Sequence, residues 1–371
     1  MAVWGKRADM TVHEAEPFNA EPPAAVLAEG SATGTDAFFV RNHGPVPRIE
    51  PEQWRLRVTG RVAEPLVLPL AQLRARFPVH EIVATLQCAG NRRAGLMRVR
   101  DIPGEAPWGA GATSTAVWTG VRLSDVLDAA GAARDAGHVA FEGTDVSPEA
   151  TPPQRFGGSI ALAAAHRDDV LLAWAMNGAP LPVVHGGPVR VVVPGQVGAR
   201  SVKWIERITV QDPPSDNYFQ ARSYRLLPPE ADPGEPGAGF ALGPVAVNSD
   251  ILVPDDGAEV PAGPLTVRGY AFAGGDRGVA RVDVSTDDGR TWRQAELADP
   301  IGPWAWRLWR HRLDVRAGPV EITARAWDTA AGVQPESQAQ LWNPKGYANN
   351  AWARVRVTAT RVSAVDGPGR R

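Results

Sequence analysis

Short alternations of apolar and polar residues, bounded by turn residues, run through the first part of the chain. They predict strands over residues 54–62, 80–87, 170–176, 189–193 and 202–210. A helical pattern covers residues 70–77, and Ser124 is the expected N-cap of a second helix that ends at Gly131. Because helices and strands do not alternate in a regular βαβ repeat, this part of the chain is typical of an α+β domain with a mixed sheet.

The pattern changes after residues 228–236, PPEADPGEP, a linker-like stretch rich in proline, glycine and acidic residues. Beyond it, strands without helices are predicted over residues 245–253, 265–272, 279–285, 292–297, 304–315, 320–327 and 352–357. The sequence Asp287-Asp288-Gly289 between two of them is typical of a tight hairpin. Seven short strands of this kind predict an all-β immunoglobulin-like sandwich.

These patterns divide the chain into three segments. The polar residues 1–20 are predicted to be poorly ordered. Residues 21–236 are expected to form the mixed α/β domain, and residues 237–371 the sandwich.

Composition and charge narrow the class of protein. The 371 residues carry a formal net charge of −2, which does not favour nucleic acid or an acidic membrane surface as a partner. The sequence shows no apolar run of about 18 residues and no apolar signal core or twin-arginine pair, so a cytoplasmic protein without a membrane span is expected. The single cysteine excludes an intrachain disulfide.

That cysteine, Cys88, follows an apolar strand and enters the loop Gly90-Asn91-Arg92-Arg93. An inert core thiol is the ordinary alternative for a lone cysteine. The nearby arginines favour a different interpretation, because they are expected to lower the pKa of the thiol. A thiolate ligates soft metals or attacks electrophiles.

A second candidate segment, HGGPVR at residues 185–190, is followed by GARSVKW at residues 198–204. Glycines together with Arg190, Ser201 and Lys203 on loops between apolar strands provide the donors of an anion site, although ordinary turns would have a similar composition. The spacing fits neither the Walker nor the Rossmann motif, so a nucleotide is not indicated. A third segment, FFVRNHGPVP at residues 38–47, would on its own be interpreted as a surface loop.

Taken together, the ordered segments resemble the sulfite oxidase family of molybdopterin-dependent oxidoreductases. The resemblance covers residues 38–360, including the molybdopterin domain and the immunoglobulin-like dimerisation domain. It is carried by FFVRNHGPVP, ATLQCAGNRR, WGAGATSTAVWTGVRLSDV, HGGPVRVVVPGQVGARSVKW and WNPKGYANNAW.

The resemblance implies a role for individual residues. Cys88 is implied as the molybdenum ligand. The implied substrate pocket contains Arg41, His43, Arg93, Tyr224 and Lys345, where many members have arginine in place of Lys345. The residues implied to hold the pterin and its phosphate are Phe39, Val40, Arg41, Asn42, His43, Gly143, Thr144, Asp145, His185, Arg190, Ser201, Val202 and Lys203.

The implied reaction is the oxidation of sulfite to sulfate by a homodimer with a molybdenum–molybdopterin cofactor. The sequence contains no Cys-x-x-Cys-His motif and no cytochrome b5-like segment, so no haem is expected and electrons are expected to pass to oxygen or a cytochrome. Two related reactions remain open. One is the reduction of nitrate, although nitrate-reducing relatives have asparagine at the position of Tyr224. The other is the reduction of methionine sulfoxide, although relatives with that activity lack the second domain. The non-enzymatic alternative is an immunoglobulin-like binding protein without molybdenum.

Overall fold

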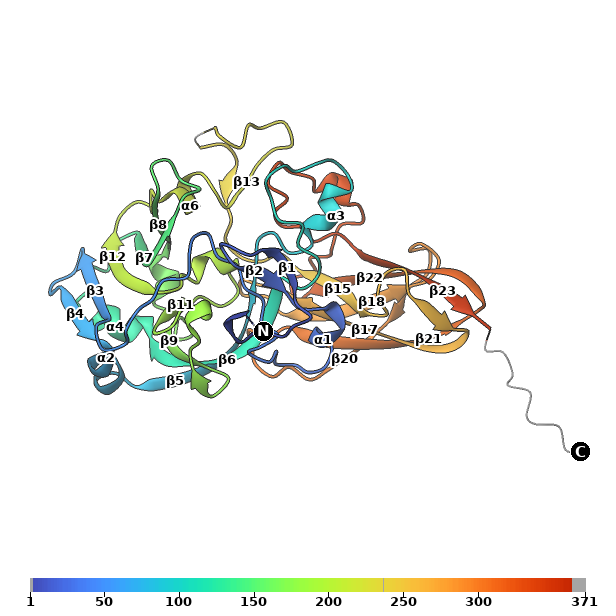
Figure 1. Cartoon of the computed structure of the whole chain (residues 1–371), viewed down its shortest axis with the longest axis horizontal. Helices are drawn as coiled ribbons and strands as arrows, with labels where there is room; N and C mark the ends of the chain where they lie inside the picture. Colours follow the sequence, from blue (N-terminus) through green and yellow to red (C-terminus); the bar gives the residue numbers. More distant parts are fainter. Residues whose placement is uncertain (1–2, 236, 362–371) are drawn as a thin grey trace, which may run out of the picture.

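The computed structural model describes residues 3–235 and 237–361 and consists of a mixed α/β domain followed by an elongated β domain (Figure 1). The first domain contains two five-stranded sheets. In one, the order is β10-β9-β6-β5, and β11 pairs with β9; in the other, the order is β4-β3-β12-β7-β8. The first sheet comprises β5 (Val79–Gln87), β6 (Thr113–Arg122), β9 (Leu171–Met176), β10 (Ala179–Pro180) and β11 (Arg190–Val192), and the second comprises β3 (Arg55–Gly60), β4 (Leu66–Pro69), β7 (His138–Ser147), β8 (Gln154–Ala161) and β12 (Ile205–Gln211).

Helices in the described part of the chain are short, the longest having seven residues. They are α1 (Ala24–Leu27), α2 (Leu70–Arg76), α3 (Arg93–Met97), α4 (Leu123–Ala129), α5 (Leu162–Ala165) and α6 (Tyr218–Ala221), with 3₁₀ turns at η1 (Val3–Gly5), η2 (Val183–His185), η3 (Gly198–Arg200) and η4 (Gln338–Gln340). None of these helices is long and apolar enough to cross a membrane, within the residues that the structure describes.

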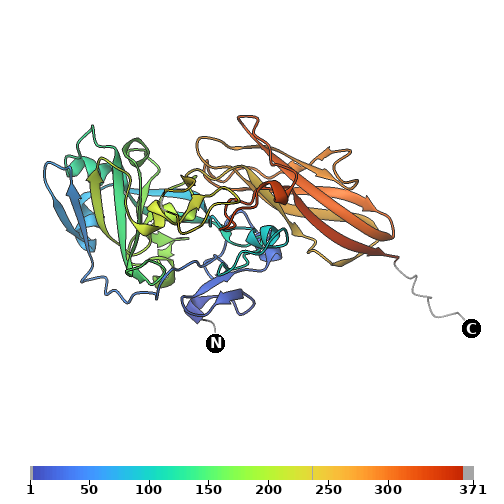
Figure 2. The same cartoon turned by 90° about the horizontal axis from the view of Figure 1, so that it is seen from above.

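The second domain is a sandwich of two sheets, whose strands run side by side along the domain in Figure 2. The small two-stranded sheet of β13 (Arg225–Leu226) and β14 (Phe240–Ala241) precedes it. One sheet of the sandwich has the order β15-β17-β21-β20 and the other β16-β23-β22-β18-β19. Their bounds are β15 (Asn248–Val253), β16 (Glu259–Pro261), β17 (Gly263–Phe272), β18 (Val279–Ser285), β19 (Arg293–Gln294), β20 (Glu296–Leu297), β21 (Arg307–Val315), β22 (Gly318–Asp328) and β23 (Ala353–Thr360). The predicted fold class, a mixed α/β domain followed by a β sandwich, is confirmed.

Two local predictions differ from the structure, and several strands were not predicted. Ser124 is not an N-cap, because α4 begins at Leu123 and Arg122 occupies the cap position without a side-chain hydrogen bond. The strand predicted over residues 292–297 is divided into β19 and β20, which pair with different sheets. β6, β7, β8 and β16 were not predicted from the sequence.

The N-terminal segment also differs from the prediction of a poorly ordered stretch over residues 1–20. From residue 3 onward it forms η1 and a hairpin of β1 (Thr11–Glu14) and β2 (Asn19–Glu21). Phe18 and Ala20 pack into a small apolar cluster with Val40, and Lys6 is only 3% exposed. A few buried anchors therefore order a segment whose average composition is polar.

The two domains share buried polar contacts close to the loop that follows β5. The Arg92 Nε and the Asp250 Oδ2 atoms lie 2.9 Å apart, and Asn91 Nδ2 donates to the Tyr270 hydroxyl at 2.8 Å. Arg92 also donates to the Ala351 carbonyl at 2.7 Å. The second domain thus fixes the position of the segment that carries Cys88.

Candidate active site

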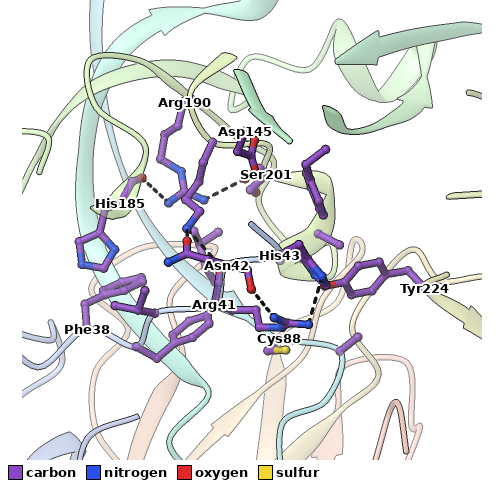
Figure 3. A pocket seen from close by; sticks show the side chains of 18 residues that line it. Phe38, Arg41, Asn42, His43, Cys88, Asp145, His185, Arg190, Ser201 and Tyr224 are labelled. Carbon is purple, nitrogen blue, oxygen red and sulfur yellow. Dashed lines mark hydrogen bonds between the residues drawn. The ribbon is translucent and has the colours of Figure 1, made fainter. Parts of the chain in front are cut away.

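Cys88 lies directly after β5, whose last residue, Gln87, forms an isolated bridge with Val197. The Cys88 backbone N–H donates to the Ala112 carbonyl at 2.9 Å, and the Gly90 N–H donates to the Cys88 sulfur at 3.4 Å. Because Arg92 then adopts a left-handed conformation with a φ of 65°, the chain turns sharply into α3. These constraints hold the sulfur at the wall of a cavity (Figure 3).

Most of the predicted site residues line this one cavity. They are Phe39, Val40, Arg41, Asn42, His43, Cys88, Asp145, His185, Arg190, Ser201, Lys203 and Tyr224. Arg41, Cys88, His43 and Tyr224 gather at one end, and Arg190 and His185 lie at the other (Figure 3). Segments that are far apart in the sequence therefore form a single site with an arginine–thiol end and a basic end.

The prediction that the pKa of Cys88 is lowered is wrong for the protein without its cofactor. Burial raises the pKa of this thiol, and the charges of Arg93 and Arg41 only partly oppose that effect. Arg92 does not contribute, since it points to Asp250 and the carbonyls of the second domain. A thiol in this position ionises when a metal ion takes the place of its proton.

The basic end is built from four nitrogen bases around η2, of which Lys6, His185 and Arg190 are buried and Lys203 is partly buried. Lys6 Nζ lies 2.6 Å from His185 Nε2. Arg190 donates to the carbonyls of His185 and Ser201, each at 2.9 Å. Lys203 donates to the Arg41 carbonyl at 3.0 Å and to the side-chain oxygen of Asn42.

These bases have little compensating negative charge, and their pKa values show it. Burial lowers the pKa of Lys6 to about 7 and that of Arg190 to about 9. Burial and neighbouring positive charges lower the pKa values of His185 and Lys203. Asp145 compensates only in part, because burial raises its own pKa to about 6. An anion with more than one charge would remove this mutual repulsion.

Two further atoms beside the basic end have unused hydrogen-bonding capacity. Thr144 Oγ1 and Asp145 Oδ1 are buried and have no hydrogen-bond partner among the residues that the structure describes. Because buried polar atoms are almost always paired and Asp145 lines the cavity, its unpaired oxygen is suited to a polar ligand. The basic end, this oxygen and the Cys88 sulfur together fit a phosphorylated group that also carries a soft metal.

At the arginine–thiol end, Tyr224, His43 and Glu149 form a hydrogen-bonded chain. The Tyr224 hydroxyl lies 2.5 Å from His43 Nε2, and His43 Nδ1 contacts the Glu149 carboxylate. Burial raises the pKa of Tyr224, so the phenol stays protonated and donates to Nε2. Burial and the charge of Arg41, whose Nη2 lies 3.1 Å from Nδ1, lower the pKa of His43 to about 4. The imidazole is therefore neutral near pH 7, and its Nδ1–H donates to Glu149.

Five predicted residues do not line the cavity. Arg93 and Lys345 lie beside it and contact Glu105 instead. Gly143, Thr144 and Val202 support the basic end from behind. A Cβ atom at Gly143 would lie 2.6 Å from the Lys203 carbonyl oxygen, so only glycine allows this close approach.

Sequence reasoning did not find Lys6, Glu105 and Glu149. Lys6 lies in a polar segment without a motif, and Glu105 and Glu149 lie in irregular loops. They are far in sequence from the site residues that they contact; Lys6 and His185, for example, are 179 residues apart. No local sequence pattern therefore indicates these contacts.

Comparison with known proteins agrees with this geometry. Residues 43–219 match the family model of the oxidoreductase molybdopterin binding domain, and residues 241–360 match that of the Mo-co oxidoreductase dimerisation domain. The chain is 48% identical to sulfite oxidase of Gallus gallus over 93% of this chain and 77% of that protein. It is 37% identical to sulfite oxidase of Arabidopsis thaliana over 93% of each chain. The chain spans about 65% of the length of the mammalian relatives that it matches.

Among solved structures, the sulfane dehydrogenase SoxCD from Paracoccus pantotrophus superposes with a TM-score of 0.80 and 28% identity, covering 92% of this chain and 84% of that one. The fold and the site thus define a molybdenum oxidoreductase with a pterin-binding domain and a dimerisation domain. The chain belongs to the sulfite oxidase family, and the resemblance noted in the sequence is confirmed.

The basic end predicts that anion binding is linked to proton uptake. At pH 8, Lys6 is largely neutral because its pKa is about 7, and a bound dianion raises that pKa by favouring the charged form. Titration of cofactor-free protein with inorganic sulfate, by calorimetry in buffers of different ionisation enthalpy, should show net uptake of protons. The Lys6→Met variant should take up fewer protons. An enthalpy that does not depend on the buffer would contradict this prediction.

Proposed function

We propose that the protein oxidises sulfite to sulfate. One observation carries the proposal: the Cys88 sulfur, the Arg41 guanidinium and the Tyr224 hydroxyl line the same cavity. Relatives that are named sulfite oxidases and share 37% to 48% identity with the chain support it.

The pterin-bound molybdenum, held by Cys88 and the basic end, would supply the two-electron redox chemistry. The described residues contain no cluster of three or more His, Cys, Asp or Glu side chains suited to a metal ion, so further ligands would come from the cofactor. Arg41 would bind the oxyanion and orient it toward the sulfur end of the cavity. The neutral His43 accepts from Tyr224 and so fixes the position of the phenol at the arginine–thiol end of the cavity.

The test is a steady-state assay of molybdenum-loaded protein with sulfite, nitrate and methionine sulfoxide. Sulfite oxidation is expected to give the highest kcat/KM by a wide margin. Faster turnover of nitrate or the sulfoxide would overturn the proposed substrate. Absence of molybdenum from protein produced in a host that makes the cofactor would instead favour the binding-protein alternative.

The acceptor and the compartment also belong to the proposal. Electrons are proposed to pass to an external acceptor, oxygen or a cytochrome, in the cytoplasm. Parallel assays of oxygen consumption and of cytochrome c reduction distinguish the two acceptors.

The second domain, which matches a dimerisation model over residues 241–360, leads us to propose a homodimer. Light scattering at micromolar concentration should give twice the chain mass of 39.6 kDa. A chain ending before residue 237 should be monomeric if it folds. A full-length protein that scatters as a 39.6 kDa particle would contradict the proposed assembly.

A further inference from the structure

Glu105 lies in the loop between α3 and β6 and binds two cationic side chains with one carboxylate. Its Oε2 atom is 3.1 Å from Arg93 Nη2, and its Oε1 atom is 2.9 Å from Lys345 Nζ. The Glu105 side chain is 14% exposed and that of Arg93 is 3% exposed, so the first ion pair is shielded from water. Arg93 comes from the first domain and Lys345 from the second, and the carboxylate joins them.

The other two nitrogens of Arg93 also donate within the protein. Its Nε donates to the Lys345 carbonyl and its Nη1 to the Ala106 carbonyl, each at 3.0 Å. The guanidinium packs against Gly90, where an added Cβ would lie 2.6 Å from Nη2. Gly90 in turn donates to the Cys88 sulfur, so the Glu105 ion pairs lie directly behind the arginine–thiol end of the cavity.

We propose that Glu105 is a specificity-determining residue that neutralises part of the positive charge of Arg93 and Lys345 and so weakens the binding of anions at the arginine–thiol end of the cavity. Arg41 is the one cation of the three predicted for the substrate pocket that lines the cavity. The other two share a counter-ion, so the three residues Arg93, Lys345 and Glu105 contribute a net charge of about +1 rather than +2. A dianionic substrate or product therefore meets a weaker field, which favours release of a sulfate product.

This inference rests on the proposed function, and the Glu105→Gln variant of the loaded enzyme tests it. The amide keeps the size and a hydrogen-bonding oxygen but removes the charge. We expect the KM for sulfite and the inhibition constant of sulfate each to fall by about fivefold, while kcat stays within about twofold or decreases. Glu105→Asp, which keeps the charge, should behave like the wild type. Glu296→Gln is the matched control, since its carboxylate pairs with Arg310 at 2.8 Å on an exposed face of the second domain.

Charge compensation separates this role from a merely structural one. Lys345→Met alone should raise the KM, because the net charge of Arg93, residue 345 and Glu105 then falls from about +1 to zero. The double variant Glu105→Gln/Lys345→Met restores a net charge of +1 and should return the KM to near the wild-type value. If Glu105 had only a structural role, the effects of the two substitutions on the KM would add up instead of cancelling. A KM for Glu105→Gln that is unchanged or higher would overturn the proposal, as would a double variant weaker than Lys345→Met.

The affinity for inorganic sulfate, measured by calorimetry without turnover, distinguishes a failure of the proposed role of Glu105 from a failure of the proposed sulfite oxidation. Tighter sulfate binding by Glu105→Gln in a protein that does not oxidise sulfite would refute the proposed function and support the role of Glu105. Sulfite oxidation with equal sulfate affinity in both proteins would do the reverse.

Discussion

Replacement of Cys88 by serine should abolish sulfite oxidation while leaving the fold intact. The residue is buried at 7% exposure, and serine only replaces the sulfur with a smaller oxygen, so no group of the fold is displaced around residue 88. An alcohol is a far poorer ligand than a thiolate for a soft metal. Loss of an orienting partner beyond the ligands typically costs 10- to 100-fold, so loss of the ligand itself should lower kcat by about 100-fold or more.

Three measurements on Cys88→Ser separate the causes of that loss. Circular dichroism and the melting temperature report on the fold, and pterin fluorescence after release reports on cofactor content. We expect a normal fold and retained pterin, since the basic end of the cavity is unchanged. Serine-substituted protein with near-normal turnover would show that the sulfur does not hold the metal.

Several elements, including the strand before Cys88, could be predicted from the sequence because their patterns are local, whereas β6, which pairs with that strand, was not predicted. β5 spans residues 79–87 where 80–87 was predicted, and β18 has the predicted bounds. α2 also agrees closely, ending one residue earlier than predicted. In these segments, intrinsic propensity and tertiary packing favour the same structure.

What could not be predicted is the partner of each charged side chain. Arg92 and Arg93 are adjacent in sequence, yet Arg92 binds Asp250 and Arg93 binds Glu105. The left-handed turn at Arg92 sends the two side chains to different neighbours, and the sequence motif contains no information about that turn. The prediction that the pKa of Cys88 is lowered was wrong for the same reason. Burial depends on the packed fold, and its effect on this pKa outweighs that of the nearby arginines.

The position of Lys345 shows the same limit. The sequence block around it predicts a third cationic contact for the oxyanion. In the structure the Lys345 side chain is 26% exposed, and its ammonium group is paired with Glu105 beside the cavity. Whether a cation faces a substrate depends on the carboxylates that compete for it, and Glu105 lies 240 residues away in the sequence.

Replacement of Arg41 by glutamine should give the largest change in substrate affinity. Among the three predicted pocket cations, Arg41 is the one that lines the cavity, and its side chain is 21% exposed. Arg93 and Lys345 are bound to Glu105 and cannot fully replace it. A hydrogen bond to a charged group contributes about 1.5–3 kcal/mol, so the KM for sulfite should rise by roughly 10- to 100-fold.

Lysine at the same position is the matched control for Arg41→Gln. Arg41→Lys keeps the positive charge but loses the planar fork that can hold two oxygens, so an intermediate KM is expected. The Arg41 side chain also contacts His43 and lies 3.5 Å from Glu149, and its removal should ease the repulsion that disfavours the charged imidazole. The pKa of His43 should therefore rise above its value of about 4, which NMR of the imidazole can measure. A molybdenum-replete Arg41→Gln enzyme whose KM lies within twofold of the wild type would show that another residue binds the oxyanion.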